Sequence, residues 1–165
     1  MIVLLALLND LPVMTIAYDH VMYSSEPEKW DMRMLLGIAT ALGLMGVLET
    51  FGILYVGLEQ LKLSRETLQS FIYLKLSVAG HLLMLMARTR GPFWSVRPAI
   101  PLLIAVVATQ LIATLITVYG IMLPAMGWRL ALFVWAYCLV VLFVIDFLKV
   151  RLYDLLDHRD IRFKR

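Results

Sequence analysis

Charged residues are scarce in this sequence, and their scarcity excludes an ordinary water-soluble domain. Only 16% of the residues are charged while 62% are hydrophobic, against about 25% and about 45–50% in an average soluble protein. A globule of 165 residues has too large a surface for so few polar side chains to cover. The composition therefore indicates a membrane protein.

Other missing features exclude whole classes of function. Cys138 is the only cysteine, so the chain cannot form an internal disulfide. His20, His81 and His158 lie far apart and lack the spacing of metal ligands. The sequence has no glycine-rich phosphate loop, no DKTG-type phosphorylation sequence and no Ser/His/Asp arrangement. The basic residues flank apolar segments instead of forming one patch, which excludes a nucleic-acid partner. We expect no cofactor or metal in this chain.

Five long apolar segments make up most of the sequence. About 20 apolar residues in a helix cross a hydrocarbon core about 30 Å thick. Lipid offers no hydrogen-bond partner to the backbone, so a single segment that crosses it must be a helix. The sequence therefore predicts an all-α, multi-pass transmembrane bundle of about five helices, in a single membrane domain covering 1–165. The expected spans are about 1–18, 34–58, 68–87, 99–123 and 128–150, followed by a short basic cytoplasmic tail, 151–165.

Lysine and arginine predict the orientation, because cytoplasmic loops are enriched in them. Five spans place eleven of these residues on one side and four on the other. The richer side should be cytoplasmic, with the N-terminus outside and the C-terminus inside. The eleven are Lys29, Arg33, Arg88, Arg90, Arg97, Lys149, Arg151, Arg159, Arg162, Lys164 and Arg165. The four are Lys62, Arg65, Arg129 and Lys75, the last expected near the membrane interface.

Asp10 is the strongest candidate for function. An ionisable side chain at mid-membrane costs about 2.5–3.5 kcal/mol on insertion scales, so its presence requires a reason. Asp10 lies beside Asn9 near the middle of the first span, and Pro12 should unwind the helix there because it cannot donate a backbone hydrogen bond. Unwound helices line ion sites in transporters, where a buried carboxyl group can bind and release a proton. The alternative is a protonated Asp10 that bonds structurally to a neighbouring helix.

Other polar residues inside the spans favour structural roles. Glu49 could be a proton-relay carboxylate, but pairing with a polar group on another helix is favoured. His81, one turn after Ser77 on the same helical face, is expected to bond within the bundle in preference to relaying protons. Gln110 and the threonines of the fourth span are expected to form hydrogen bonds between helices.

Local signals predict helix ends and contacts. Ser64 is a plausible N-cap for the third span, and Asp146 with Lys149 forms a helical i, i+3 pair. Small residues on one face of the second span predict a close approach of a neighbouring helix. They are Ala39, Gly43, Gly46 and Thr50.

Several segments resemble, in order, the sixth to tenth membrane helices of the plasma-membrane proton-pumping P-type ATPases. The first span and its loop, LLALLNDLPVMTIAYDHV, are similar to the sixth helix. Three later segments are similar, in order, to the eighth, ninth and tenth helices: YLKLSVAGHLLMLMARTRGPFW, RPAIPLLIAVVATQLIATLITVYG and GWRLALFVWAYCLVVLFVIDFLKV. The pair Leu11-Pro12 resembles the prokaryotic branch, since plant and fungal members have Gly-Thr there.

This resemblance implies a specific role for the first span. In the family, the aspartate of the Asn-Asp pair binds the transported proton, so Asp10 would be the acceptor, with Asn9 and Pro12 shaping the helix around it. The domains that bind ATP and Mg precede this region in the family and are missing from the chain. The chain would therefore supply the transport carboxylate and a supporting bundle, without enzymatic activity of its own.

The resemblance also implies partners and a location. The expected partners are the lipid bilayer, the proton and the N-terminal part of the same pump, in the plasma membrane. A different class of function stays open at this point. The chain could be an independent small multi-pass membrane protein that serves as an assembly or interaction partner.

Overall fold

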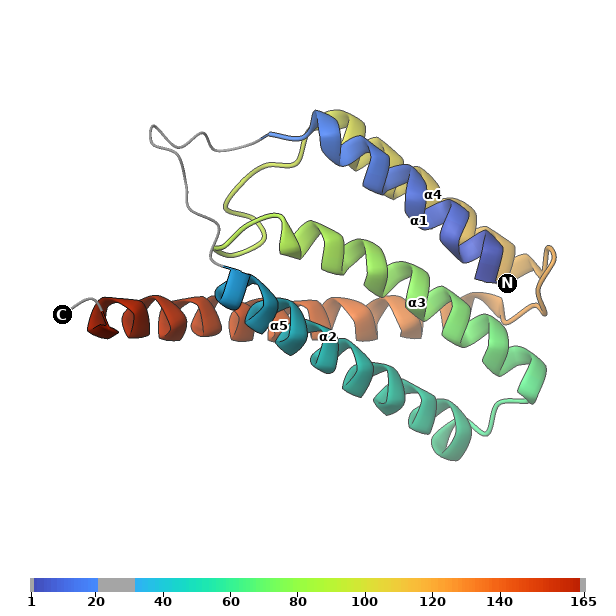
Figure 1. Cartoon of the computed structure of the whole chain (residues 1–165). Coiled ribbons are helices and arrows are strands. Elements are labelled where there is room, and N and C mark those ends of the chain that lie inside the picture. Colours follow the sequence, from blue (N-terminus) through green and yellow to red (C-terminus); the bar gives the residue numbers. More distant parts are fainter. Residues whose placement is uncertain (1, 21–31, 164–165) are drawn as a thin grey trace.

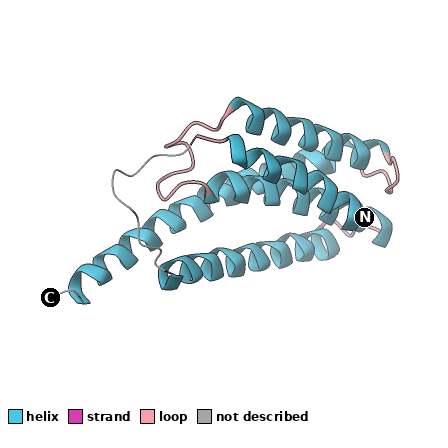
Figure 2. Ribbon diagram, turned by 45° about the horizontal axis from the view of Figure 1, so that its top comes forward, coloured by secondary structure: helices cyan, strands magenta, loops and turns pink. Residues whose placement is uncertain are grey.

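Five α-helices form the described part of the chain, which confirms the all-α prediction (Figure 1). The computed structural model describes residues 2–20 and 32–163, with the backbone alone at 33, 154 and 156–163. The helices are α1 (Ile2–Thr15), α2 (Met32–Tyr55), α3 (Arg65–Ala87), α4 (Ile100–Tyr119) and α5 (Gly127–Phe163). A 3₁₀ turn, η1 (Ile16–Tyr18), follows α1, and a π-helical turn, η2 (Val56–Gln60), extends α2. Figure 2 shows that loops join these helices in the described residues.

Four helical segments are long and apolar enough to cross a membrane. They are Met34–Gln60, Arg65–Ala87, Ile100–Tyr119 and Gly127–Tyr153. These segments agree closely with the spans expected at 34–58, 68–87, 99–123 and 128–150. The first expected span, 1–18, corresponds to a shorter apolar segment, Ile2–Tyr18. The chain is therefore a multi-pass membrane protein.

Helix α5 continues well past its expected end. Its 37 residues correspond to about 55 Å of helix, more than the hydrocarbon core requires. Figure 1 shows its C-terminal turns projecting beyond the other helices. The segment expected as the basic tail, 151–165, is helical as far as Phe163, because it contains no glycine or proline that would end the helix before that residue.

Local sequence explains where the central helices begin and end. The Ser64 side chain accepts a hydrogen bond from the Thr67 backbone N–H at 3.3 Å, which confirms Ser64 as the N-cap of α3. Helix α4 ends at Gly120, which adopts the left-handed conformation with φ of +76°. A Cβ atom at Gly120 would lie 2.9 Å from the Ala125 Cβ. Glycine at this position is therefore required both by conformation and by space.

Helix α3 is the centre of the bundle and contacts each of the other four α-helices. Half of the apolar stretch of α3 is buried within the chain, whereas only 11% of the corresponding stretch of α2 is buried. Helix α1 lies along α4 and also contacts α3, whereas α2 packs mainly against α5 (Figure 1). The central apolar cluster includes Leu8, Phe71, Leu74, Val78 and Val134. One face of α1 is thus fixed to this cluster.

The small-residue face of α2 does not pack as the sequence predicts. A Cβ atom added at Gly43 or Gly46 would meet nothing within 4 Å, and Ala39 is exposed. The Thr50 hydroxyl donates to the Gly46 carbonyl at 2.7 Å, within the same helix. Within the described part of the chain, the expected close approach of a neighbouring helix was therefore wrong at Ala39, Gly43 and Gly46, whereas Thr50 contacts Lys75 of α3.

Candidate functional site

Helix α1 is continuous through its Asn-Asp-Pro element. The α-helix runs from Ile2 to Thr15 with Pro12 inside it, so the expected local unwinding at Pro12 was wrong. Proline removes only one backbone hydrogen bond directly, and the bonds on either side can hold the helix together. The Thr15 hydroxyl also donates to the Pro12 carbonyl at 2.7 Å. The candidate transport helix is therefore an intact helix followed by a 3₁₀ turn.

Asn9 and Asp10 face different sides of α1. Asn9 is partly buried against α3, where its amide nitrogen would lie 3.5 Å from a Cβ atom at Gly80. The Asn9 Oδ1 atom is buried and has no hydrogen-bond partner among the described residues. Asp10 is exposed and shares the outer face of α1 with Leu7 and Met14. The two adjacent polar residues therefore face different surroundings: Asn9 faces α3, and Asp10 faces outward from the bundle.

Asp10 is unpaired within the described residues. No hydrogen bond or ion pair joins its carboxylate to any of them. Leu8 and Pro12, on the opposite face of α1, are buried. The carboxylate therefore projects from the face of α1 that the rest of the described chain leaves uncovered.

His81 lies in a buried polar network between α3 and α4. Its Nδ1 atom is 2.8 Å from the Ser77 carbonyl and 2.8 Å from Nε2 of Gln110. Its Nε2 atom is 3.0 Å from the Thr109 hydroxyl. His81 and Gln110 thus form the hydrogen bonds between helices that the sequence predicts.

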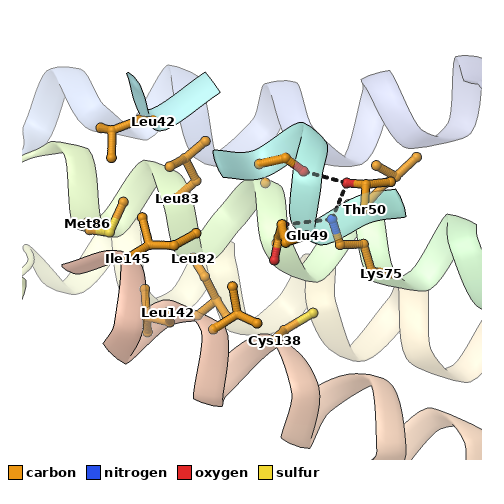
Figure 3. Close-up of a pocket in the computed structure, with 15 residues that line it drawn as sticks. Leu42, Glu49, Thr50, Lys75, Leu82, Leu83, Met86, Cys138, Leu142 and Ile145 are labelled. Carbon is orange, nitrogen blue, oxygen red and sulfur yellow. Dashed lines mark hydrogen bonds and ion pairs between the residues drawn. The ribbon is translucent and has the colours of Figure 1, made fainter. Parts of the chain in front are cut away.

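Glu49 pairs with Lys75, a residue whose role sequence reasoning missed. The Lys75 Nζ atom donates to Glu49 Oε1 at 2.7 Å and also to the Thr50 hydroxyl (Figure 3). The Tyr137 hydroxyl donates to the Glu49 backbone carbonyl at 2.8 Å. Lys75 is 1% exposed and lies near the middle of α3. Its central position within the apolar stretch 68–87 was the signal that could have revealed a buried partner.

The Glu49–Lys75 pair borders a groove between α2, α3 and α5. The groove has a volume of about 200 Å³. Glu49 and Lys75 contribute its charged side chains, and most of its other lining is apolar (Figure 3). The two opposite charges at this edge of the groove form an ion pair with each other.

Asp146 and Lys149 form the predicted i, i+3 pair, which is buried. The Lys149 Nζ atom lies 2.7 Å from Asp146 Oδ1 and donates to the Met86 carbonyl at 2.9 Å. The other carboxylate oxygen of Asp146 accepts from the Phe93 backbone N–H at 3.1 Å. This pair therefore fastens α5 to the end of α3 and to the loop that follows it.

Asp19 forms a third ion pair at the end of the first helical segment. Its carboxylate accepts from the Arg88 side chain and, at 2.8 Å, from the Ala99 backbone N–H. Burial alone would raise the pKa of Asp19, but these hydrogen bonds and the positive charge of Arg88 lower that pKa below its usual value. Asp19 thus fixes the end of η1 to the end of α3 and the start of α4.

The structure does not gather the site residues predicted from the sequence into one place. Asn9 of α1 lies against Gly80, the residue that precedes His81 in α3. Glu49 is paired with Lys75, and Asp10 faces outward. Among the described residues, no three histidine, cysteine, aspartate or glutamate side chains are grouped so that they could hold a metal ion.

Comparisons with known proteins give similarity over most of the chain. A putative cation-transporting ATPase of Methanocaldococcus jannaschii is 42% identical over 151 residues, which are 91% of this chain and 19% of that protein. Plasma membrane ATPase 2 of Saccharomyces cerevisiae is 34% identical over 126 residues, 73% of this chain and 13% of that protein. A probable proton ATPase of Leishmania donovani is 28% identical over a gapped alignment of 192 positions, which covers 98% of this chain and 20% of that protein. No family model matches the chain.

Proposed function

Because the chain is homologous to the carboxy-terminal membrane segment, about 20%, of P-type cation and proton ATPases, we propose that it supplies the proton-binding carboxylate of such a pump. Asp10 on α1 is the proton acceptor, and α2 to α5 form the bundle that supports α1. The homologous segment lacks the catalytic domains of these enzymes. ATP and Mg would therefore be bound by other parts of the pump.

The outward, unpaired position of Asp10 carries this proposal. A charged group inside the membrane costs about 2.5–3.5 kcal/mol on insertion scales unless protein groups or water compensate it. No described residue of the chain compensates Asp10. Further helices packed against Leu7, Asp10 and Met14 would bury the carboxyl group and offer it polar partners. The N-terminal part of the same pump is the partner whose helices would cover this face.

The chemistry required of Asp10 is reversible protonation. Burial favours the neutral acid, while a nearby cation or hydrogen-bond donor favours the carboxylate. A conformational change that exchanges these surroundings makes the group bind a proton on one side of the membrane and release it on the other. The energy for that change comes from ATP hydrolysis in the domains that this segment lacks. Asn9, held against α3, keeps the adjacent turn of α1 in place.

The proposed orientation has the N-terminus outside the cell and the C-terminus in the cytoplasm. Support comes from the excess of lysine and arginine on one side of the spans. The homologues include plasma membrane ATPases, and the same location is proposed here.

A fusion protein tests the proposed function. The chain replaces the carboxy-terminal part of the archaeal relative, and the fusion is reconstituted into vesicles. We expect ATP-driven acidification of the vesicle lumen. If the fusion folds and hydrolyses ATP but moves no protons, the chain is not a proton-pump segment. If the chain does not assemble with the rest of the pump at all, the alternative of an independent small membrane protein is supported instead.

A further inference from the structure

The two ring nitrogens of His81 face different kinds of partner. Nδ1 lies 2.8 Å from the backbone carbonyl oxygen of Ser77, and a carbonyl oxygen can only accept a hydrogen bond. Nδ1 must therefore carry a hydrogen. The Gln110 amide, also 2.8 Å from Nδ1, is compatible with this, because a half-turn of the amide presents its oxygen to the ring in place of its nitrogen.

Nε2 faces a partner that can change its role. The Thr109 hydroxyl lies 3.0 Å from Nε2, and a hydroxyl can both donate and accept. The same hydroxyl donates to the Ala105 carbonyl at 2.8 Å. A bare Nε2 would accept the Thr109 hydrogen, whereas a protonated Nε2 would donate to the Thr109 oxygen and leave that hydrogen on Ala105. Rotation of one O–H bond thus completes the hydrogen bonds of either form of the ring.

The ring has no charged partner among the described residues. No hydrogen bond or ion pair joins it to a charged side chain, and α4 contains no lysine, arginine, aspartate or glutamate. Away from the ends of the spans, the ionisable side chains of the other helices are Asp10, Glu49, Tyr73, Lys75, Tyr137, Cys138, Asp146 and Lys149. The charged groups among them form ion pairs with each other, except Asp10, which faces outward.

These surroundings do not fix the ring in one charge state. Burial without a counter-charge favours the neutral imidazole, whereas an acceptor at each nitrogen favours the imidazolium. The Ser77 carbonyl accepts from Nδ1 in both forms, and the Thr109 hydroxyl adapts to the state of Nε2. Reversible protonation therefore requires no repacking of α3 against α4.

A groove between α3, α4 and α5 borders the ring. His81, Gln110 and Trp135 line it together with apolar side chains, and its volume is about 250 Å³. One water molecule needs only about 10–15 Å³ of such space and a few polar partners. The Gln110 Oε1 atom is buried and has no hydrogen-bond partner among the described residues. Water that enters the groove would find this acceptor beside the ring and would supply the proton.

We propose that Nε2 of His81 is a second proton-binding atom of this chain, separate from the Asp10 carboxylate. The Nε2 lone pair takes up the proton, Nδ1 keeps its hydrogen on the Ser77 carbonyl, and the Thr109 hydroxyl hydrogen turns from Nε2 to the Ala105 carbonyl. Release of the proton reverses these changes.

The site lies beside the helix that carries Asp10. Asn9 of α1 packs against Gly80, the residue that precedes His81 in α3. Reversible protonation of His81 stands without the proposed function, whereas any part that this proton takes in transport rests on it.

Ring ¹⁵N NMR of the full chain in lipid nanodiscs tests this proposal. The chain has three histidines, so His20→Gln with His158→Gln leaves His81 as the only imidazole and keeps the groups around it unchanged. Between about pH 5 and pH 8 we expect Nδ1 to stay protonated while Nε2 changes from bare to protonated as the pH falls. If the double variant does not fold, the signals that His81→Gln removes from the unchanged chain identify the ring.

Three outcomes of this titration would overturn the proposal. The ring stays neutral over the whole range, or both nitrogens stay protonated over the whole range, or Nε2 keeps its hydrogen while Nδ1 titrates.

Substitutions at Thr109 test the part of its hydroxyl. Thr109→Val removes a partner from both forms of the ring, but hydrogen bonds to a charged group are about twice as strong as those between neutral groups. Protonation of Nε2 should therefore need a proton concentration higher by roughly tenfold. Thr109→Ser keeps the hydroxyl and should titrate as the unchanged chain does. Equal titration of Thr109→Val and the unchanged chain would overturn the assignment of this hydroxyl as the partner of the bound proton.

The proposed function can fail separately from this proposal. Asp10→Asn should leave the titration of Nε2 in place, because Asp10 faces outward and has no contact with the ring among the described residues. Normal proton transport by an Asp10→Asn pump would refute the role of Asp10 alone. Loss of the Nε2 titration in a folded Asp10→Asn chain would contradict a His81 site that is separate from Asp10.

Discussion

The Lys75 ammonium group lies 2.7 Å from the Glu49 carboxylate, and this ion pair connects two helices that otherwise touch little. Lys75 is 1% exposed and the Glu49 side chain 12%. The Thr50 hydroxyl completes the surroundings of the ammonium group. Such a pair stabilises the fold little by itself, but removal of one partner leaves the other charged and buried.

We therefore expect Lys75→Met to destabilise the chain by about 3–5 kcal/mol, because Glu49 loses its partner. Glu49→Gln should also destabilise the chain, because the buried Lys75 ammonium group loses its counter-charge and keeps only a hydrogen bond to the amide. The double change Lys75→Met with Glu49→Met should recover most of the loss. Denaturation in mixed detergent micelles measures these differences, with the exposed Lys62→Met as control. Equal stability of Lys75→Met and the control would contradict the structural role of the pair.

Asp19 should make stability depend on acid pH. Its pKa is lower in the folded chain than the ordinary value of 3.8. Its contribution is therefore fully present above about pH 4 and is lost as the pH falls through the lower folded pKa. The charged and titratable groups beside it are Arg88 and His20. In Asp19→Asn, the fall in unfolding free energy between pH 4 and pH 2 should be smaller than in the unchanged chain.

The matched control is Glu66→Gln, an exposed residue in the first turn of α3. This variant should keep the acid dependence of the unchanged chain. An identical acid dependence in Asp19→Asn would show that the contact of Asp19 with Arg88 and Ala99 does not stabilise the fold.

Two glycine substitutions should have opposite effects on stability. Gly120→Ala places a Cβ atom 2.9 Å from that of Ala125 at a φ of +76°, and the left-handed conformation alone costs a non-glycine residue about 1–2 kcal/mol. Gly43→Ala meets nothing within 4 Å in the described chain and should stabilise α2 by about 0.5–1 kcal/mol. Thermal denaturation in detergent compares the two variants. A destabilising Gly43→Ala would indicate that another helix approaches this face.

Asp10 should be unfavourable in the chain by itself. Because its carboxylate has no partner among the described residues, Asp10→Leu should improve membrane insertion of α1 by about 2.5–3.5 kcal/mol. Asp146→Leu should instead destabilise the chain, since Lys149 and the Phe93 N–H lose their acceptor. A translocon-insertion assay of the full chain measures the first effect. Unchanged or poorer insertion of Asp10→Leu would mean that Asp10 is compensated within the chain.

Apolar runs made the architecture predictable from sequence. A continuous apolar stretch long enough to cross a membrane has one stable backbone solution, the helix, and the four long spans agree closely with the prediction. The course of α1 was less predictable. A proline signals a missing backbone hydrogen bond but not whether the helix unwinds there, and α1 stays helical from Ile2 to Thr15 with Pro12 inside it.

The pairing of polar residues required the structure. Sequence spacing predicted the pair of Asp146 with Lys149, because the two residues lie about one turn apart on the same helix. The partner of Glu49 is on another helix, so spacing could not identify Lys75. Asp19 directly follows the first expected span, 1–18, and its contacts with Arg88 and Ala99 join segments that lie far apart in the sequence.

Proton transport by an Asp10→Asn pump tests the central claim most directly. The asparagine is similar in size but cannot bind and release a proton, so the fusion pump should fold and lose ATP-driven acidification of vesicles. Glu49→Gln should reduce expression or stability while the protein that remains transports protons. Normal acidification by the Asp10→Asn variant would contradict the assignment of Asp10 as the proton acceptor.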